Sequence, residues 1–158
     1  MTTILLTGKV HSGKSTELMN LCDDKKAYGL INPTDENGEK QFHLISINTS
    51  FSMNAKPDEA AIEVGKYRFS EAAFARANRE LMDEWNRAEG LFIVDEVGKL
   101  ELAEKGLSPA IRHILSRVNP KVDTIIWVIR DYLLEEASRV FGWESATVIY
   151  KEDLALLG

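Results

Sequence analysis

The chain of 158 residues contains a single cysteine, Cys22, so no internal disulfide bond can form. A composition with one cysteine fits a reducing compartment. The sequence also lacks a long apolar segment, and no charged leader precedes its first apolar run. We therefore expect neither a transmembrane helix nor a signal peptide, and we predict a cytoplasmic protein.

Clusters of basic residues are also missing. The chain has 19 Lys and Arg residues against 25 Asp and Glu residues, which gives a formal net charge of −6. Surfaces that bind nucleic acid concentrate lysine and arginine on one face, so the sequence predicts no nucleic-acid partner. There is no internal repeat, and the length and hydrophobic content of 44% suit one domain over residues 1–158.

A phosphate-binding pattern stands near the start of the chain. Residues 8–15 read G-K-V-H-S-G-K-S, which fits G-x-x-x-x-G-K-S/T at every fixed position. The apolar run of residues 4–6 before it predicts a short buried strand. Leu18, Leu21 and Cys22 after it fall on one face of a predicted helix. This strand, loop and helix order is the context in which the pattern indicates a P-loop.

Each part of this segment has a task in binding a triphosphate. Glycines let the backbone curl so that consecutive N–H groups point at the phosphates, and the following helix adds the positive end of its dipole. We expect Lys14 to reach the β- and γ-phosphates and the Ser15 hydroxyl to bind Mg²⁺. The predicted nucleotide-binding residues are Gly8, Lys9, Val10, His11, Ser12, Gly13, Lys14, Ser15 and Thr16.

Strand and helix patterns alternate along the rest of the chain. Continuous apolar runs at 91–94 and 124–129 predict strands covered on both faces. Ser70 is a suitable N-cap for a helix that ends near Gly90. The apolar stripe of that helix consists of Phe74, Ala77, Leu81, Trp85 and Ala88. The alternation predicts an α/β fold with a mostly parallel sheet and helices on both faces.

Shorter elements complete the predicted fold. Residues 26–47 read as an antiparallel hairpin around the turn Asn37-Gly38, and residues 64–69 as one short strand. A helix is predicted from Ser108 as N-cap and Pro109 as the first helical residue. Its buried side would hold Ile111, Ile114, Leu115 and Val118. A helix over 131–141 and a last strand over 146–150 follow.

An acidic pair at the end of a buried strand provides the second half of a candidate site. Asp95 and Glu96 follow the apolar run 91–94. The carboxyl ends of strands are where open α/β sheets bind ligands. We expect Asp95 to serve Mg²⁺ and Glu96, which should point elsewhere, to act as general base toward water. The alternative is an acidic pair that only begins a turn.

Charge that develops on a transferred phosphoryl group needs cationic help. Lys99 lies just past the acidic pair, Arg130 ends the next predicted strand, and Arg68 stands between two aromatic residues. Each of these residues is a candidate for phosphate contact, with a solvated surface charge as the alternative. The aromatic candidates for stacking on a base, against ordinary packing, are Tyr67, Trp127 and Tyr132.

Residues 7–16 and 91–102 resemble the small P-loop nucleoside-triphosphatases, a RecA-like group. The second stretch reads D-E-V-G-K-L-E where that family typically reads D-E-I-G-K-M-E. The resemblance implies a RecA-like core and slow, Mg²⁺-dependent hydrolysis of several nucleoside triphosphates. It also implies a metal role for Asp95, a base role for Glu96 and a catalytic role for Lys99. Residues 9–12 depart from the family by having little glycine and proline, and residues 38–42 lack its arginine and second glycine.

Three functions are consistent with these patterns. The first is a hydrolase of ATP, GTP and other triphosphates, with catalytic roles for Lys14, Glu96, Lys99 and Arg130. The second is a nucleoside or nucleotide kinase, which shares the phosphate loop but usually carries an arginine-rich lid; the arginines here are scattered. The third is a regulatory protein whose contacts with a partner change with the bound nucleotide.

Overall fold

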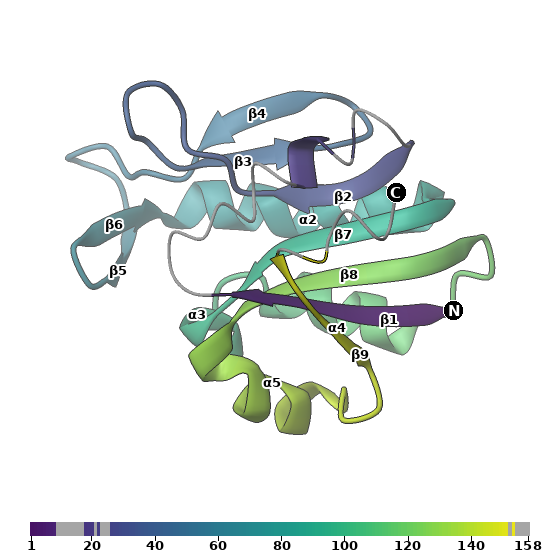
Figure 1. Cartoon of the computed structure of the whole chain (residues 1–158). Coiled ribbons are helices and arrows are strands. Elements are labelled where there is room, and N and C mark those ends of the chain that lie inside the picture. The colour runs from purple at the N-terminus through teal and green to yellow at the C-terminus, as the bar shows by residue number, and fades with distance from the viewer. Residues whose placement is uncertain (9–17, 21, 23–25, 152, 154–158) are drawn as a thin grey trace.

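The computed structural model describes residues 1–8, 18–20, 22, 26–151 and 153. Seven of its strands form one sheet: β1 (Thr2–Gly8), β2 (Ala27–Ile31), β3 (Gln41–Leu44), β4 (Thr49–Ser52), β7 (Gly90–Val97), β8 (Val122–Arg130) and β9 (Thr147–Tyr150). Their order across the sheet is β4-β3-β2-β7-β8-β1-β9 (Figure 1). Residues 9–16, which carry most of the predicted phosphate loop, lie outside the described residues.

The sheet is mostly parallel, as predicted. β1 pairs in parallel with β8 and β9, and β7 pairs in parallel with β2 and β8. β3 and β4 are added antiparallel at one edge. The hairpin predicted over residues 26–47 corresponds to β2 and β3. β3 ends at Leu44 rather than Ile47, because residues 45–48 form a turn in which the Asn48 N–H donates to the Ile45 carbonyl at 3.3 Å.

The helices that lie wholly within the described residues are α2 (Glu71–Arg87), α3 (Lys99–Leu102), α4 (Ser108–Ser116) and α5 (Leu134–Phe141), with a 3₁₀ turn η1 (Asp131–Leu133) before α5. The N-cap prediction for α2 is confirmed, since the Ser70 hydroxyl accepts from the Ala73 N–H at 3.1 Å. All five residues of its predicted apolar stripe are buried. This stripe fixes α2 against one face of the sheet.

The prediction for α4 needs two corrections. Leu107, not Ser108, is the N-cap, because its carbonyl accepts the first bond of the helix from the Ile111 N–H at 3.0 Å, and Pro109 is therefore the second helical residue. Leu115 and Val118 are 45% and 91% exposed, so they do not belong to the buried side. Val118 lies beyond the end of α4 at Ser116, where the helical period that predicted its burial no longer applies.

Residues 64–69 do not form one strand. β5 (Ala61–Val64) and β6 (Tyr67–Ser70) make a separate antiparallel hairpin in which Val64 pairs with Tyr67. Gly65 in the turn has φ +57°, a backbone conformation that glycine adopts without a steric cost. The chain therefore reverses inside the predicted strand and creates a small lobe beside the main sheet (Figure 1).

Two apolar clusters cover the two faces of the sheet. The larger one joins Leu5 of β1 to residues of α2, α4 and α5. The second includes Ile4 and Leu6, the sequence neighbours of Leu5, together with the buried Leu18, which is helical. Side chains alternate between faces along a strand, so β1 contributes to both clusters. Within the described part of the chain, no helix combines the length and the apolar character needed to cross a membrane.

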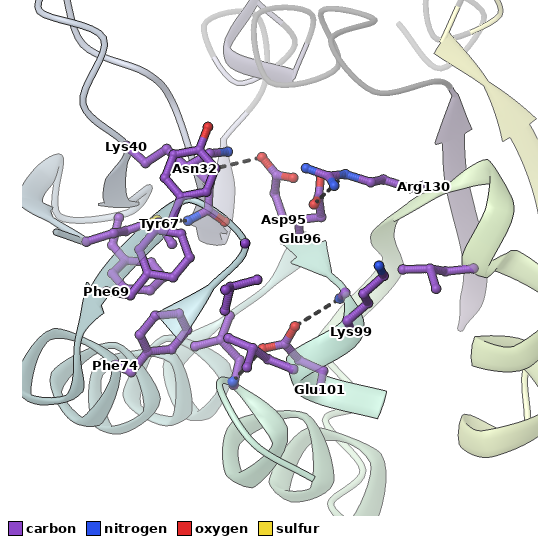
Figure 2. A pocket seen from close by; sticks show the side chains of 18 of the residues that line it. Asn32, Lys40, Tyr67, Phe69, Phe74, Asp95, Glu96, Lys99, Glu101 and Arg130 are labelled. Carbon is purple, nitrogen blue, oxygen red and sulfur yellow. Dashed lines mark hydrogen bonds and ion pairs between the residues drawn. The ribbon is translucent and has the colours of Figure 1, made fainter. Parts of the chain in front are cut away.

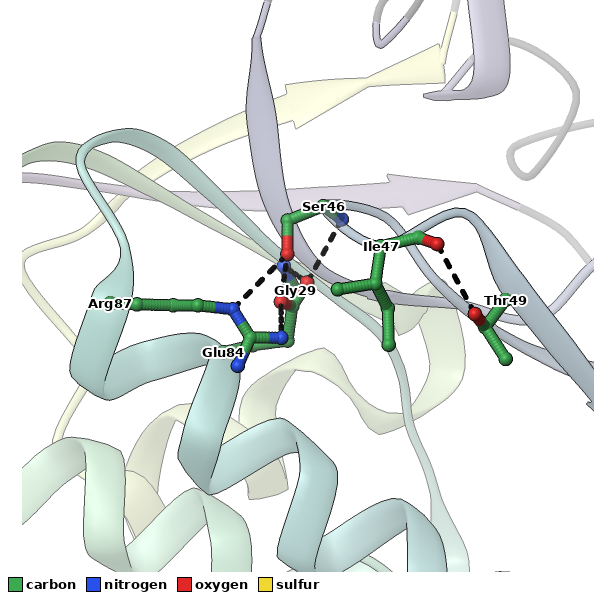
Figure 3. A network of polar contacts seen from close by, with 6 residues as sticks. All are labelled: Gly29, Ser46, Ile47, Thr49, Glu84 and Arg87. Carbon is green, nitrogen blue, oxygen red and sulfur yellow. Dashed lines mark hydrogen bonds and ion pairs between the residues drawn. The ribbon is translucent and has the colours of Figure 1, made fainter.

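A buried carboxylate ties α2 to β2 and to the turn after β3. Glu84, fully buried on α2, accepts from the backbone N–H groups of Gly29 and Ser46 at 3.0 Å each and from the Ser46 hydroxyl (Figure 3). The Arg87 guanidinium donates to it at 2.5 Å. A Cβ atom on Gly29 would lie 2.0 Å from the Ile93 carbonyl oxygen, so only glycine fits at this point of β2.

Candidate functional site

The start of the predicted phosphate loop and the acidic pair lie at the same edge of the sheet. β8 is the only strand between β1 and β7. Gly8, the last residue of β1, pairs with Arg130, and Asp95 of β7 pairs with Val128 of the same strand. Neighbouring strands are about 4.8 Å apart, so β1 and β7 are separated by roughly 10 Å. Gly8, the first residue of the predicted phosphate loop, therefore ends β1 at the same edge of the sheet as Asp95 and Glu96.

A pocket of about 360 Å³ opens at this edge, between the carboxyl ends of the strands and the β5–β6 hairpin (Figure 2). Three acids and four bases line its polar part: Asp95, Glu96, Glu101, Lys40, Lys66, Lys99 and Arg130. Aromatic and aliphatic side chains from β3, β6 and α2 line its apolar part: Phe42, Phe69 and Phe74 among them. The pocket thus combines the acidic pair and Arg130 at the ends of β7 and β8 with an aromatic wall that faces them.

Asp95 is held in place at the end of β7. Its side chain belongs to a residue only 2% exposed, and the backbone N–H of Asn32 donates to its Oδ2 at 3.1 Å. Asn32 follows β2, so the neighbouring strand fixes the orientation of the carboxylate. A carboxylate oxygen presented at this edge is a ligand type that Mg²⁺ prefers.

Glu96 occupies an irregular position in β7. Asp95 pairs with Val128, and Val97 pairs with Ile129, the next residue of β8, so Glu96 is an extra residue on its strand. An extra residue of this kind breaks the alternation of side chains and re-aims them. Both carboxylates consequently line the same pocket (Figure 2). Within it they take different partners, since Asp95 accepts from Asn32 beside β2 and Glu96 pairs with Arg130 of β8.

Arg130 forms an ion pair with Glu96, in which Nε lies 3.1 Å from Oε1. Both side chains are 29% exposed. Burial opposes the charge on Arg130, but the nearby Glu96 and Tyr132 outweigh it and raise the pKa of the guanidinium. Arg130 therefore brings a permanent positive charge to the acidic pair.

Of the other predicted cations, one lines the pocket and one does not. Lys99 begins α3, is exposed, and its Nζ lies 5.6 Å from the centroid of the Tyr132 ring. Arg68 instead donates to the backbone carbonyls of Lys56 and Glu59 at 2.7 and 2.8 Å. Arg68 thus stabilises the loop before β5 and is not part of the pocket lining.

The predicted aromatic candidates also separate. Trp127 is 1% exposed and packs on Trp143 with ring centroids 4.7 Å apart, so it belongs to the core. Tyr67 and Tyr132 line the pocket. Lys40 and Lys66 were not predicted as site residues, although Lys40 lies in the segment 38–42 that was compared with the family. Asn32 could have been predicted, because it follows an apolar strand pattern in the same way that Asp95 follows residues 91–94.

Glu101 supports the loop between β7 and α4. It is 5% exposed and accepts from the backbone N–H groups of Gly98 at 2.9 Å and Leu107 at 2.8 Å. Burial raises the pKa of this carboxyl above its ordinary value of 4.5, although the two N–H groups oppose the rise. A Cβ atom on Gly106 would lie 2.0 Å from Glu101 Oε2, so glycine is required there.

The raised pKa of Glu101 predicts a pH-dependent stability difference. As the pH rises past 4.5, the unfolded chain loses the Glu101 proton before the folded chain does, so folded stability falls until the folded pKa is passed. The variant Glu101→Gln lacks this titration. Urea unfolding at about pH 4 and about pH 7 should therefore show wild type losing stability relative to the variant, by about 1.4 kcal/mol per unit of pKa shift. A constant or widening advantage of wild type would contradict this.

Of the two predicted Mg²⁺ ligands, Asp95 lies within the described residues, and its carboxylate suits this ion. Among the described residues, no three His, Cys, Asp or Glu side chains come together as a metal cluster. Mg²⁺ needs no such cluster, because it is usually held by one or two carboxylates, substrate phosphates and water. The buried carboxylate of Asp95 suits that role. Ser15, the other predicted ligand, lies outside the described residues.

Comparison with known proteins agrees with this geometry. A family model described as NTPase matches residues 3–153. The chain belongs to this NTPase family. A search of the curated proteins found no match.

Two solved structures share the fold of this NTPase. The solution structure of a human cancer-related nucleoside triphosphatase has a TM-score of 0.72 at 18% identity, over 99% of this chain and 95% of that one. The crystal structure of THEP1 from the hyperthermophile Aquifex aeolicus has a TM-score of 0.62 at 21% identity, over 96% and 92%. At these identities the likeness establishes the fold of a P-loop NTPase, with its mostly parallel sheet and antiparallel hairpin.

Proposed function

We propose that the protein hydrolyses nucleoside triphosphates, ATP and GTP among them, slowly and with Mg²⁺, to diphosphates and phosphate. The observation that carries this proposal is the shared sheet edge. The strand that leads into the predicted phosphate loop ends at Gly8, one strand away from Asp95 and Glu96. Membership of the NTPase family and a nucleoside triphosphatase among the structural neighbours support the same class of reaction.

In this proposal the residues divide the work. Residues 8–16 bind the phosphates, with Lys14 at the β- and γ-phosphates. Asp95 and Ser15 hold Mg²⁺, which neutralises charge on the phosphates when it is bound. Glu96 accepts the proton of the attacking water, because its carboxylate faces the same pocket as Asp95. Lys99 and Arg130 offset the negative charge that develops on the transferred group.

The ion pair with Arg130 gives Glu96 a defined orientation before substrate arrives. One nitrogen of the guanidinium, Nε, contacts Glu96. A guanidinium has five N–H donors, so Arg130 can contact the γ-phosphate without leaving Glu96. The base at the end of β7 and the charge-stabilising group at the end of β8 would then act as one fixed unit.

Phosphate release from ATP, GTP, CTP and UTP, each with Mg²⁺ and with excess chelator, tests the proposal. We expect release from several of the four with Mg²⁺ only. The variant Asp95→Asn should lower the rate at least about 100-fold, because several kcal/mol of charge stabilisation depend on the metal. Asp123→Asn is the matched control, since Asp123 is exposed near the opposite end of β8. Release by Asp95→Asn at the control rate would contradict the proposal.

The kinase remains the second candidate, and one observation favours it. The pocket continues past Glu96 to Tyr67 and the apolar wall, which gives room for an acceptor larger than water. Transfer to an added nucleoside that is much faster than release to water would establish a kinase in place of a hydrolase.

A further inference from the structure

The end of the pocket that lies away from the acidic pair is lined by aromatic rings and lysines, which hydrolysis does not require. The β5–β6 hairpin forms this end, and Tyr67 is partly buried there (Figure 2). The Tyr67 ring stacks on Phe69, with centroids 5.3 Å apart and planes 9° from parallel. Phe69 in turn packs on Phe74 of α2 at 5.8 Å. A continuous aromatic wall therefore faces the pocket opposite the acidic pair.

Two lysines from different segments converge on this wall. The Nζ atoms of Lys40, just before β3, and Lys66, in the hairpin turn, lie 5.7 and 5.4 Å from the Tyr67 ring centroid. In the part of the chain that the structure describes, neither lysine forms an ion pair. Both ammonium groups lie near the same ring, so an anion placed beside that ring would be stabilised by their positive charge. This concentration of positive charge occurs on a chain whose net charge is −6.

The pocket also has more room than a water molecule needs. Its volume of about 360 Å³ lies in the range of small-molecule sites, which span roughly 300–1,000 Å³, whereas one water takes about 30 Å³. Such sites are mostly apolar with a few placed polar groups. The combination of an aromatic wall and paired ammonium groups matches a flat ring that carries one anionic group.

We propose that this end of the pocket binds a second nucleotide, a nucleoside monophosphate, with its base against the aromatic wall and its phosphate at Lys40 and Lys66. The proposal rests on the proposed function in one respect, that a triphosphate places its γ-phosphate at Glu96. The base of a triphosphate is attached at the opposite end of its phosphate chain. It therefore extends away from Glu96 toward β1, and the wall beyond Glu96 stays available.

The sheet order supports this separation. The strands run β3-β2-β7-β8-β1, so the acidic pair of β7 and Arg130 of β8 stand between the start of the phosphate loop and the segments that carry Lys40 and Asn32. Two ligands would meet at Glu96 from opposite directions. The second nucleotide would then exclude bulk water from the γ-phosphate.

Titration calorimetry on the full chain tests the proposal. The protein is first saturated with Mg²⁺ and the non-hydrolysable analogue β,γ-imido-ATP, and AMP, GMP, CMP and UMP are then added separately. We expect at least one of the four to bind with one site per chain. Tyr67→Ala and Lys66→Ala should weaken this binding about tenfold or more, and Tyr67→Phe should keep it, because the ring remains. Lys121→Ala, at the opposite end of the sheet, is the control and should leave it unchanged.

Each other outcome overturns the proposal. Absence of binding for all four monophosphates removes the site. One-for-one displacement of the ATP analogue by a monophosphate means that a single nucleotide site exists. An equal loss in Lys121→Ala and Lys66→Ala means that the attraction is a general one to positive charge. Failure of the proposed function gives another pair of results. The chain would then release no phosphate from triphosphates, while calorimetry would still detect monophosphate binding that depends on Tyr67.

Discussion

Replacement of Glu96 by glutamine is expected to lower phosphate release by about 10²–10⁴-fold, the usual range for loss of a positioned general base. Glutamine has nearly the same shape but cannot accept a proton from water. Triphosphate affinity should change little, because binding is assigned to residues 8–16 and to the metal at Asp95. Single-turnover phosphate release and titration with a fluorescent triphosphate measure the two quantities separately.

Two comparison variants make this result specific. Glu144→Gln removes the same charge at an exposed residue outside the pocket and should behave as wild type. Arg130→Gln breaks the 3.1 Å ion pair but leaves the carboxylate of Glu96 in place. If Glu96→Gln releases phosphate as fast as Glu144→Gln, Glu96 is not the base. If Glu96→Gln and Arg130→Gln both lose triphosphate affinity together with activity, the Glu96–Arg130 pair shapes the binding site instead.

The sequence predicted those parts of the fold that depend on local pattern. The apolar runs 91–94 and 124–129 became β7 and β8, and the stripe of α2 is buried as expected. The β5–β6 hairpin was missed because its turn, Gly65-Lys66, is only two residues long and lies inside an otherwise extended pattern. The burial of Glu84 was also hidden, because a charged residue interrupts a helical stripe unless its partners are known.

The two halves of the candidate site were each visible as motifs, but their shared pocket was not. The extra residue at Glu96 depends on how β7 pairs with β8, which no local pattern contains. Lys40 and Lys66 come from separate segments, and both reach the Tyr67 ring only because β6 is held beside residues 53–55, which follow β4. Side chains that reach a site from turns are determined by tertiary packing, so their positions needed the structure.

The largest loss of stability is expected from removal of the buried carboxylate of Glu84. Glu84→Ala should lower the free energy of unfolding by about 3–5 kcal/mol, because each buried N–H group left without a partner costs about 1–3 kcal/mol and the lost side chain leaves a cavity. The change would leave the N–H groups of Gly29 and Ser46 without an acceptor and open a cavity between α2 and the sheet. Urea unfolding at neutral pH measures this loss. Asp83→Ala, at the exposed neighbouring position of α2, should change stability by less than about 0.5 kcal/mol.

Two further variants divide the loss between charge and hydrogen bonding. Glu84→Gln keeps an acceptor for the two N–H groups but loses the charged partner of Arg87. Its loss of unfolding free energy should therefore fall between those of Asp83→Ala and Glu84→Ala. Arg87, with a side chain 43% exposed, can turn to solvent, so Arg87→Ala should cost less than Glu84→Ala. If Arg87→Ala proves as destabilising as Glu84→Ala, the ion pair carries the energy. The backbone contacts that join α2 to Gly29 and Ser46 would then be secondary.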